Sequence, residues 1–179
     1  MSRMIFRDAL LVTLCALACA CTHPSAPSAV SHIIKHIPQT PAPQPPTQCA
    51  PAREGAIPLA GQPRATLYIF TSDWCAACHR ALQTITSAQS DLVQRAVTIE
   101  QVVIGQGQSC FDAARVASDA PFAYSVAPTT VQDQWGVRST PTIWLVTPQQ
   151  EAVLYIEGLP PWDTFLNAIE DALNVNATR

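Results

Sequence analysis

The sequence has little of several residue types on which common functions depend. Charged residues make up only 13% of its 179 residues, and Lys35 is the only lysine. With a formal net charge of −3, the chain has no positive stripe that could follow a phosphate backbone. It also lacks the basic cluster that binds an anionic membrane surface. Binding to nucleic acid is therefore not expected.

No apolar run is long enough to span a membrane as a helix. The most apolar stretch, Ala9–Ala20, has about a dozen residues, whereas a helix needs about 20 to cross the hydrocarbon core. Arg3 and Arg7 precede this stretch, which is the pattern of an export signal. The sequence therefore predicts a protein that leaves the cytoplasm.

Cysteines at the end of this stretch indicate a second processing feature. Leu17-Ala18-Cys19-Ala20-Cys21 resembles the lipobox of bacterial lipoproteins, in which small or apolar residues precede a lipidated cysteine. Cys21 fits best; Cys19 and an ordinary cleaved signal are the alternatives. We therefore expect residues 1–21 to be a lipoprotein-type signal peptide. Thr22 follows instead of the aspartate that retains lipoproteins in the inner membrane, which favours anchoring to the outer membrane, facing the periplasm.

A proline-rich segment, residues 22–64, separates this signal from the rest of the chain. It is dominated by Pro, Ala, Ser, Gln and Thr and has few large apolar side chains. Such a segment cannot bury enough apolar surface to offset the entropy lost on ordering. We expect a flexible tether. A more apolar patch at Ser31–Ile37 is interpreted as incidental, with a docking segment as the alternative.

From Ala65 onward, strand and helix patterns alternate. Continuous β-favouring runs at Ala65–Phe70, Val97–Ile104 and Thr142–Val146 predict strands buried on both faces. Apolar residues at helical spacing predict one helix after Cys75, through Ala96, and a terminal helix from Trp162. Shorter elements are expected at Cys110–Ser118 (helix, with Phe111, Ala114 and Ala117 on one face), Pro121–Val126 (strand), Thr129–Trp135 (helix) and Ala152–Glu157 (strand). Residues 65–179 should form one α/β domain, a mixed sheet flanked by helices, with a short helix–strand insert.

The segment Trp74-Cys75-Ala76-Ala77-Cys78 lies where the first strand gives way to the long helix. Free amides and the dipole at a helix N-terminus stabilise a thiolate there, which makes Cys75 the candidate nucleophile. Cys78, one turn further on, is the candidate resolving thiol. His79 is four residues from Cys75 and could lower the pKa of its thiol, and a solvent-facing histidine without effect is the alternative.

Two other interpretations use the same residues. Cys75-Ala76-Ala77-Cys78-His79 also has the spacing of a c-type haem attachment motif. Met1 and Met4, the only methionines, would be lost with the signal, so only histidines could supply a sixth ligand. A zinc site could use both cysteines, His79 and Cys110, but an export compartment favours disulfides. A redox dithiol without metal or organic cofactor is the favoured interpretation.

Two distant segments together resemble the thioredoxin-like superfamily. Trp74–Cys78 looks like its active-site turn, and Trp135-Gly136-Val137-Arg138-Ser139-Thr140-Pro141-Thr142 looks like the stretch that carries its cis-proline. The resemblance covers about residues 65–174 and implies a thioredoxin-like fold. It also implies that Pro141 is cis and faces the dithiol, and that Trp74, Thr140 and Pro141 contact the substrate.

Exported thiol–disulfide oxidoreductases are the members that the sequence resembles. The insert at 110–126 is similar to that of periplasmic reductases of cytochrome c maturation, and the Ala-Ala spacer to the C-terminal domain of the Dsb electron conduit. The resemblance implies reductase or isomerase activity on protein disulfides or thiols, and an upstream membrane or periplasmic redox partner. A tethered chaperone or assembly module whose dithiol is dispensable is the alternative.

The sequence also departs from that family. Ile69 occupies the position at which thioredoxins carry a buried carboxylate beneath the dithiol. Glu100 on the neighbouring strand could substitute, although an exposed glutamate at a strand end is the favoured interpretation.

Cys49 and Cys110 are left over after the CxxC pair. In an oxidising compartment the favoured interpretation is a structural disulfide between them. A second redox relay, intermolecular pairing or two separate thiols are the alternatives.

Overall fold

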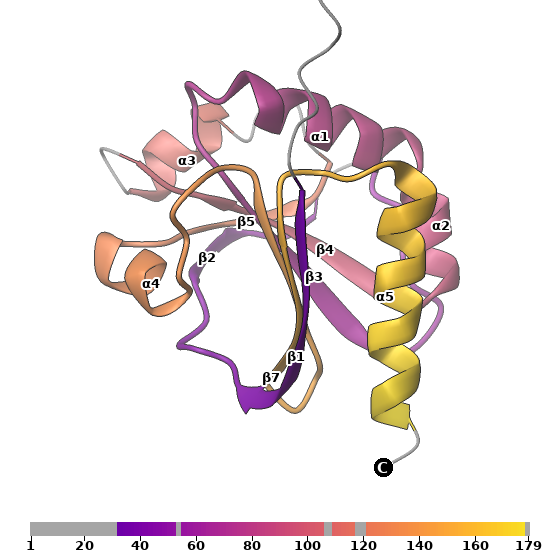
Figure 1. Cartoon of the computed structure of the whole chain (residues 1–179). Coiled ribbons are helices and arrows are strands. Elements are labelled where there is room, and N and C mark those ends of the chain that lie inside the picture. The colour runs from indigo at the N-terminus through magenta and orange to yellow at the C-terminus, as the bar shows by residue number, and fades with distance from the viewer. Residues whose placement is uncertain (1–31, 53–54, 106–108, 117–120, 178–179) are drawn as a thin grey trace, which may run out of the picture.

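A seven-stranded mixed sheet forms the centre of the protein (Figure 1). The computed structural model describes residues 32–52, 55–105, 109–116 and 121–177. The signal predicted at 1–21, with Cys19 and Cys21, lies outside these ranges. The strands are β1 (Ile33–Pro41), β2 (Thr47–Ala50), β3 (Ala65–Thr71), β4 (Val97–Val103), β5 (Ala123–Val126), β6 (Thr142–Val146) and β7 (Glu151–Glu157). The helices are α1 (Ala76–Ser87), α2 (Gln89–Gln94), α3 (Cys110–Val116), α4 (Thr129–Gln134) and α5 (Trp162–Ala177).

The strand order is β1-β7-β6-β3-β4-β5-β2. Strands β3, β4 and β5 run parallel, and the other neighbours pair antiparallel. The prediction of an α/β domain with a mixed sheet flanked by helices is therefore confirmed. Because parallel strands need crossovers, β3 leads into α1 and α2 before β4 returns beside it.

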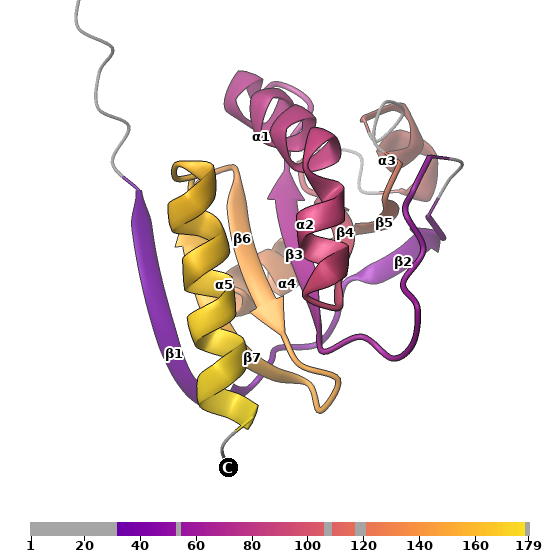
Figure 2. The ribbon, with the colours of Figure 1, turned by 90° about the vertical axis from the view of Figure 1, so that its right-hand side faces the viewer.

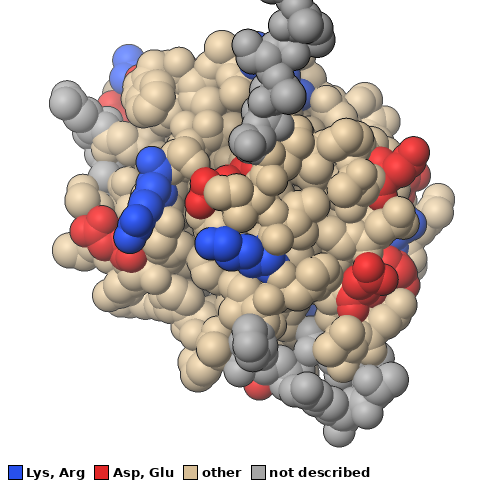
Figure 3. All heavy atoms as spheres, in the orientation of Figure 1, with Lys and Arg blue, Asp and Glu red and all other residues tan. Residues whose placement is uncertain are grey.

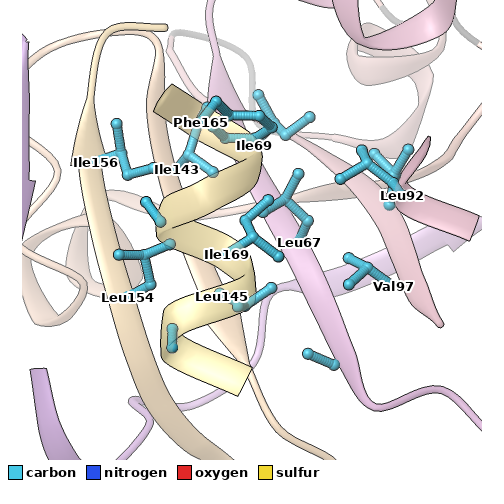
Figure 4. Packing of buried hydrophobic residues seen from close by; sticks show 14 of the residues in the cluster. Leu67, Ile69, Leu92, Val97, Ile143, Leu145, Leu154, Ile156, Phe165 and Ile169 are labelled. Atoms are coloured by element: carbon cyan, nitrogen blue, oxygen red, sulfur yellow. The ribbon is translucent and has the colours of Figure 1, made fainter. Parts of the chain in front are cut away.

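Helices cover both faces of this sheet. In Figure 2, α1, α2 and α5 lie in front of the sheet and α4 lies behind it. Side chains alternate between faces along a strand. On β3, therefore, Leu67 and Ile69 pack with Phe165 and Ile169 of α5 on the front face (Figure 4).

The face behind the sheet has its own apolar cluster around Trp135, the residue that ends α4. The Trp135 ring is buried and contacts the rings of Tyr68, Phe70 and Trp144. Its indole nitrogen donates a hydrogen bond to the carbonyl oxygen of Gln44 at 2.9 Å. The β1–β2 connection is thereby held against this face.

Both edge strands come from the segment that was expected to be a tether. β1 pairs with β7, and β2 pairs with β5. The prediction of a flexible tether up to Arg64, with the domain beginning at Ala65, is therefore wrong for 33–50. The physical reason is that the patch at 31–37, interpreted as incidental, supplies apolar contacts: Ile34 packs against the main core.

The prolines of this segment are compatible with strands because of where they lie. Pro38 is inside β1, between His36 and Thr40, where the β1–β7 register shifts. A proline removes one ladder hydrogen bond, which an edge strand or an irregularity tolerates. Prolines on an edge also prevent another strand from adding to the sheet.

A disulfide fixes the second edge. Cys49 in β2 and Cys110 at the start of α3 are joined, with their Cα atoms 5.3 Å apart. This is the pairing that the sequence favoured. It ties the N-terminal segment to the helix–strand insert.

Two helices differ in detail from prediction. The helix expected through Ala96 breaks at Ala88, where hydroxyls of Thr84 and Ser87 bond to backbone carbonyls one turn back and favour a bend. In α3, Phe111 does not face the core but is 79% exposed, and Ala113 is buried in its place.

No helix within the described ranges is both long and apolar enough to cross a membrane. Figure 3 shows one face of the molecule, on which separate Lys or Arg groups and Asp or Glu groups are scattered over a mostly uncharged surface.

We predict that the double change Cys49→Ala/Cys110→Ala lowers the free energy of unfolding by about 2–4 kcal/mol. The bond spans 61 residues of sequence, and closing a loop of that length restricts the unfolded chain. Urea denaturation of parent and variant measures the loss. Intact-mass alkylation of the unreduced parent is the control: labelling at both Cys49 and Cys110 would contradict the bond.

Candidate active site

Cys75 is the N-cap residue of α1, and Cys78 lies in its first turn. The backbone amide of Cys78 donates a hydrogen bond to the Cys75 sulfur at 3.0 Å. An N-cap side chain normally satisfies an amide left free at the start of a helix. Here the cap is the sulfur itself, so the same amide and the helix dipole would stabilise a thiolate after reduction.

The two sulfurs are joined as a disulfide in this structure. Cys75 is 6% exposed and Cys78 is 1% exposed, whereas the Trp74 side chain beside them is 76% exposed. An incoming thiol can therefore reach the edge of Cys75 more easily than Cys78. This difference matches the expected division into attacking and resolving cysteine.

The segment Thr140–Pro141 lies directly beside the Cys75 sulfur. The Thr140–Pro141 peptide bond is cis, as the family resemblance implied. The sulfur is 3.4 Å from the carbonyl oxygen of Thr140, a position to which a reduced thiol could donate. The structure thus brings together Trp74, both cysteines, Thr140 and Pro141 from segments that are distant in sequence.

Three hydrogen bonds hold this cis-proline segment in place. The hydroxyl of Ser72, which follows β3, lies 3.3 Å from the Thr140 hydroxyl. The amide of Gly158 donates to the Pro141 carbonyl at 2.8 Å. The Thr142 hydroxyl donates to the Ser139 carbonyl at 2.7 Å. The segment is therefore tied to the β3–α1 loop and to the loop that leads into α5.

A groove of about 570 Å³ runs beside the dithiol. It is bounded by α1, the cis-proline segment, the β7–α5 loop and His32. Gly158 is needed at this wall because its φ is +75° and a Cβ there would lie 3.0 Å from the His32 ring. His32 belongs to the N-terminal segment, so that segment also shapes the groove, which the sequence alone did not indicate.

His79 lies on α1 with an exposed side chain. Its backbone amide donates to the Cys75 carbonyl at 3.3 Å. No hydrogen bond from its imidazole to another described residue is present in the structure. An influence of His79 on the Cys75 thiol stays a prediction.

The geometry bears on the haem and zinc interpretations. Cys78 is 1% exposed, so solvent has almost no access to its sulfur in this structure. Cys110 is bonded to Cys49, not placed with the CxxC motif. Within the described ranges, no three His, Cys, Asp or Glu side chains are arranged to hold a metal ion.

Glu100 does not take the place of the missing carboxylate. It lies opposite Tyr68 in the β3–β4 pair, on the face away from α1, whereas Cys78 faces the other side. It is half-buried, which corrects the expectation of an exposed glutamate at a strand end, and the Ser125 hydroxyl donates to its carboxylate. Burial raises the pKa of Glu100, and burial, with Glu100 alongside, raises the pKa of Tyr68 to about 12.

Sequence reasoning missed a buried polar pair on the front face. Gln101 of β4 is 1% exposed, and its side-chain nitrogen donates to the Thr71 hydroxyl at 3.0 Å. The available signal was a glutamine in the middle of an otherwise β-favouring apolar run.

The fold and the site define the class of protein. A family model described as a thioredoxin-like domain matches residues 55–173, which is more than half of the chain. The chain therefore belongs to the thioredoxin-like family.

Solved structures of similar fold come from several bacteria. A DsbF homologue from Corynebacterium diphtheriae superposes with a TM-score of 0.57 at 12% identity, covering 82% of this chain and 96% of that one. A Chlorobium tepidum protein described as a thiol:disulfide interchange protein of the DsbE type gives 0.54 at 18% identity, covering 74% and 96%. An uncharacterized thioredoxin-like protein from Porphyromonas gingivalis gives 0.52 at 16% identity, covering 64% and 78%. At these identities the likeness shows the fold alone. A search among curated proteins found no match.

We predict that Glu100→Gln raises the free energy of unfolding at neutral pH. Because burial raises the pKa of this carboxyl, the folded protein binds its proton more tightly than the unfolded chain does. The stabilisation by the protonated Glu100 side chain is therefore fully present below pH 4.5, the pKa of this carboxyl in the unfolded chain. It is lost as the pH rises through the raised pKa of the folded protein. The glutamine of the variant still accepts a hydrogen bond from Ser125 but does not ionise. Its free energy of unfolding should therefore not fall in this way as the pH rises.

Urea denaturation between about pH 4 and pH 7 measures the difference. Asp133→Asn, on the exposed side of α4, is the matched control and should follow the parent. Parallel profiles for Glu100→Gln and the parent would contradict the prediction.

Proposed function

We propose that this protein is a thiol–disulfide oxidoreductase acting on protein substrates in the periplasm. The observation that carries the proposal is the position of the Cys75 sulfur: it caps α1 and lies 3.4 Å from the carbonyl before cis-Pro141. One side of it is activated by the helix terminus, and the other faces a backbone on which a substrate can be held.

In the reducing direction, the Cys75 thiolate attacks one sulfur of a substrate disulfide. The substrate S–S bond breaks, a mixed disulfide forms, and the other substrate sulfur leaves as a thiolate. Cys78 then attacks the Cys75 sulfur, which releases the second substrate thiol and closes the Cys75–Cys78 bond. Two electrons pass from the dithiol to the substrate, and the oxidising direction is the reverse.

Substrate binding uses the surface around the dithiol. The backbone of Thr140 can pair with an extended substrate segment, which is a short case of strand addition. Trp74, whose ring is largely exposed, supplies an apolar contact beside the attacking sulfur. The groove bounded by His32 and Gly158 continues this surface away from the cysteines.

The proposed location and redox direction rest on sequence features. The signal with Cys21 supports a lipid-anchored protein facing the periplasm, with the outer membrane favoured. The Ala-Ala spacer and the insert support a reductase, and Thr140 before cis-Pro141 supports an isomerase; a membrane or periplasmic redox partner would supply the electrons.

We predict that the reduced protein accelerates insulin disulfide reduction by dithiothreitol and that Cys75→Ser abolishes this. Cys78→Ser should instead accumulate a mixed disulfide with substrate, because the resolving step is missing. Turbidity measures reduction, and non-reducing intact mass measures the trapped adduct. Scrambled ribonuclease separates isomerisation from simple reduction.

The matched control is Cys49→Ala/Cys110→Ala, which removes the other disulfide and should retain activity where it is folded. Full activity in Cys75→Ser, or none in the parent, would favour a tethered chaperone or assembly module instead.

A further inference from the structure

Gln101 is a buried side chain whose amide is only half satisfied. Its nitrogen bonds to Thr71, but its oxygen has no partner. Of the three buried side-chain nitrogen and oxygen atoms without a hydrogen bond in the described ranges, this oxygen is the only acceptor. An unpaired buried acceptor costs free energy, so a donor is expected in some state of the protein.

The position of Gln101 follows from the strand register. Gln101 lies opposite Ile69 in the parallel β3–β4 pair, so both side chains point to the same face. That face is covered by α1 and α2, because Ile85 of α1 and Leu92 of α2 pack in the same cluster as Ile69. Thr71, which holds the Gln101 nitrogen, is the next residue of β3 on that face and the last one before the active-site loop.

The buried side of α1 packs on the same face of the sheet as this polar pair. Cys78, Ala81 and Ile85 form that side, with Cys78 at the end nearest the active-site loop. Ile85 lies over the cluster of Ile69, so Cys78 lies towards the Thr71 end of the same face. The unpaired oxygen of Gln101 is therefore on the face beneath Cys78.

Reduction of the disulfide gives Cys78 a thiol hydrogen that it can donate. Each sulfur gains a hydrogen or a charge when the disulfide opens, and Cys78, at 1% exposed, has almost no access to water. A buried thiol can donate a weak hydrogen bond. In the disulfide form Cys78 has no hydrogen to donate.

We propose that Gln101 is a positioning residue for the dithiol, whose side-chain oxygen accepts a hydrogen bond from the Cys78 thiol in the reduced protein. The inference rests on the proposed function, since it requires the pair to cycle. The amide is neutral, so it orients the proton and does not remove it. When Cys78 attacks the mixed disulfide, its proton passes to the departing substrate sulfur as the Cys75–Cys78 bond forms.

If the Gln101 oxygen receives its hydrogen bond only when Cys78 is a thiol, that bond stabilises the dithiol relative to the disulfide. Gln101→Leu should therefore shift the equilibrium with glutathione towards the disulfide by about three- to tenfold, the range of a net hydrogen bond. A tenfold shift corresponds to about 30 mV for this two-electron couple. If Gln101→Leu does not fold, Gln101→Met, which keeps the length without the oxygen, serves in its place.

Two matched variants separate positioning from a structural effect. Gln89→Leu removes another buried glutamine, on α2, and should leave the equilibrium unchanged. Thr71→Val breaks the same Gln101–Thr71 bond but keeps the Gln101 oxygen, and should shift the equilibrium less than Gln101→Leu. Urea denaturation of each variant reports stability separately.

An unchanged equilibrium in Gln101→Leu, or an equal shift in either matched variant, would overturn the inference. Failure of the proposed function looks different, because the parent itself would then not exchange reversibly with glutathione.

Discussion

The hydrogen bond from the Cys78 amide to the Cys75 sulfur is the constraint on which the site depends. It makes one atom both the cap of α1 and the reactive group. The orientation of α1 then decides which way the sulfur points, and the buried side of α1, which includes Ala81 and Ile85, holds that orientation against the core. The position of the reactive sulfur therefore depends on the packing of the core, and not on a loop that could move independently.

The cis-proline segment, which lies beside the Cys75 sulfur, is also held by more than one contact. The cis-proline segment is held by Ser72 on one side and by Gly158 on the other. Gly158 in turn lies against His32, which precedes β1. Contacts from the N-terminal segment therefore reach the reactive centre through one intermediate residue.

Much of the fold could be predicted because several strands are buried on both faces and read as continuous apolar runs. Ala65–Thr71 and Thr142–Val146 are of this kind, and the CxxC motif follows directly from the first of them. The edge strands could not be predicted in the same way, because an edge strand needs only one apolar face and tolerates proline. Pro38 and its neighbours were therefore interpreted as signs of disorder.

The missed parts of the site depend on register, which the sequence does not contain. Gln101 and Glu100 are adjacent in β4, yet they lie on opposite faces of the sheet. Which of them lies beneath Cys78 is decided by the pairing of β4 with β3 and by the side on which α1 packs. Ile69 in the sequence showed that the usual buried carboxylate is missing. Only the β3–β4 strand pairing shows that the side-chain amide of Gln101 lies beside Ile69.

The early start of the fold at Ile33 sets a length scale for a protein anchored at Cys21. Residues 22–32 can span at most about 40 Å when fully extended, because each residue adds about 3.3–3.6 Å. A tether reaching to Arg64 would have allowed several times that distance. With the proposed anchor at Cys21, the dithiol would thus work close to the membrane surface and would not sample the full width of the compartment.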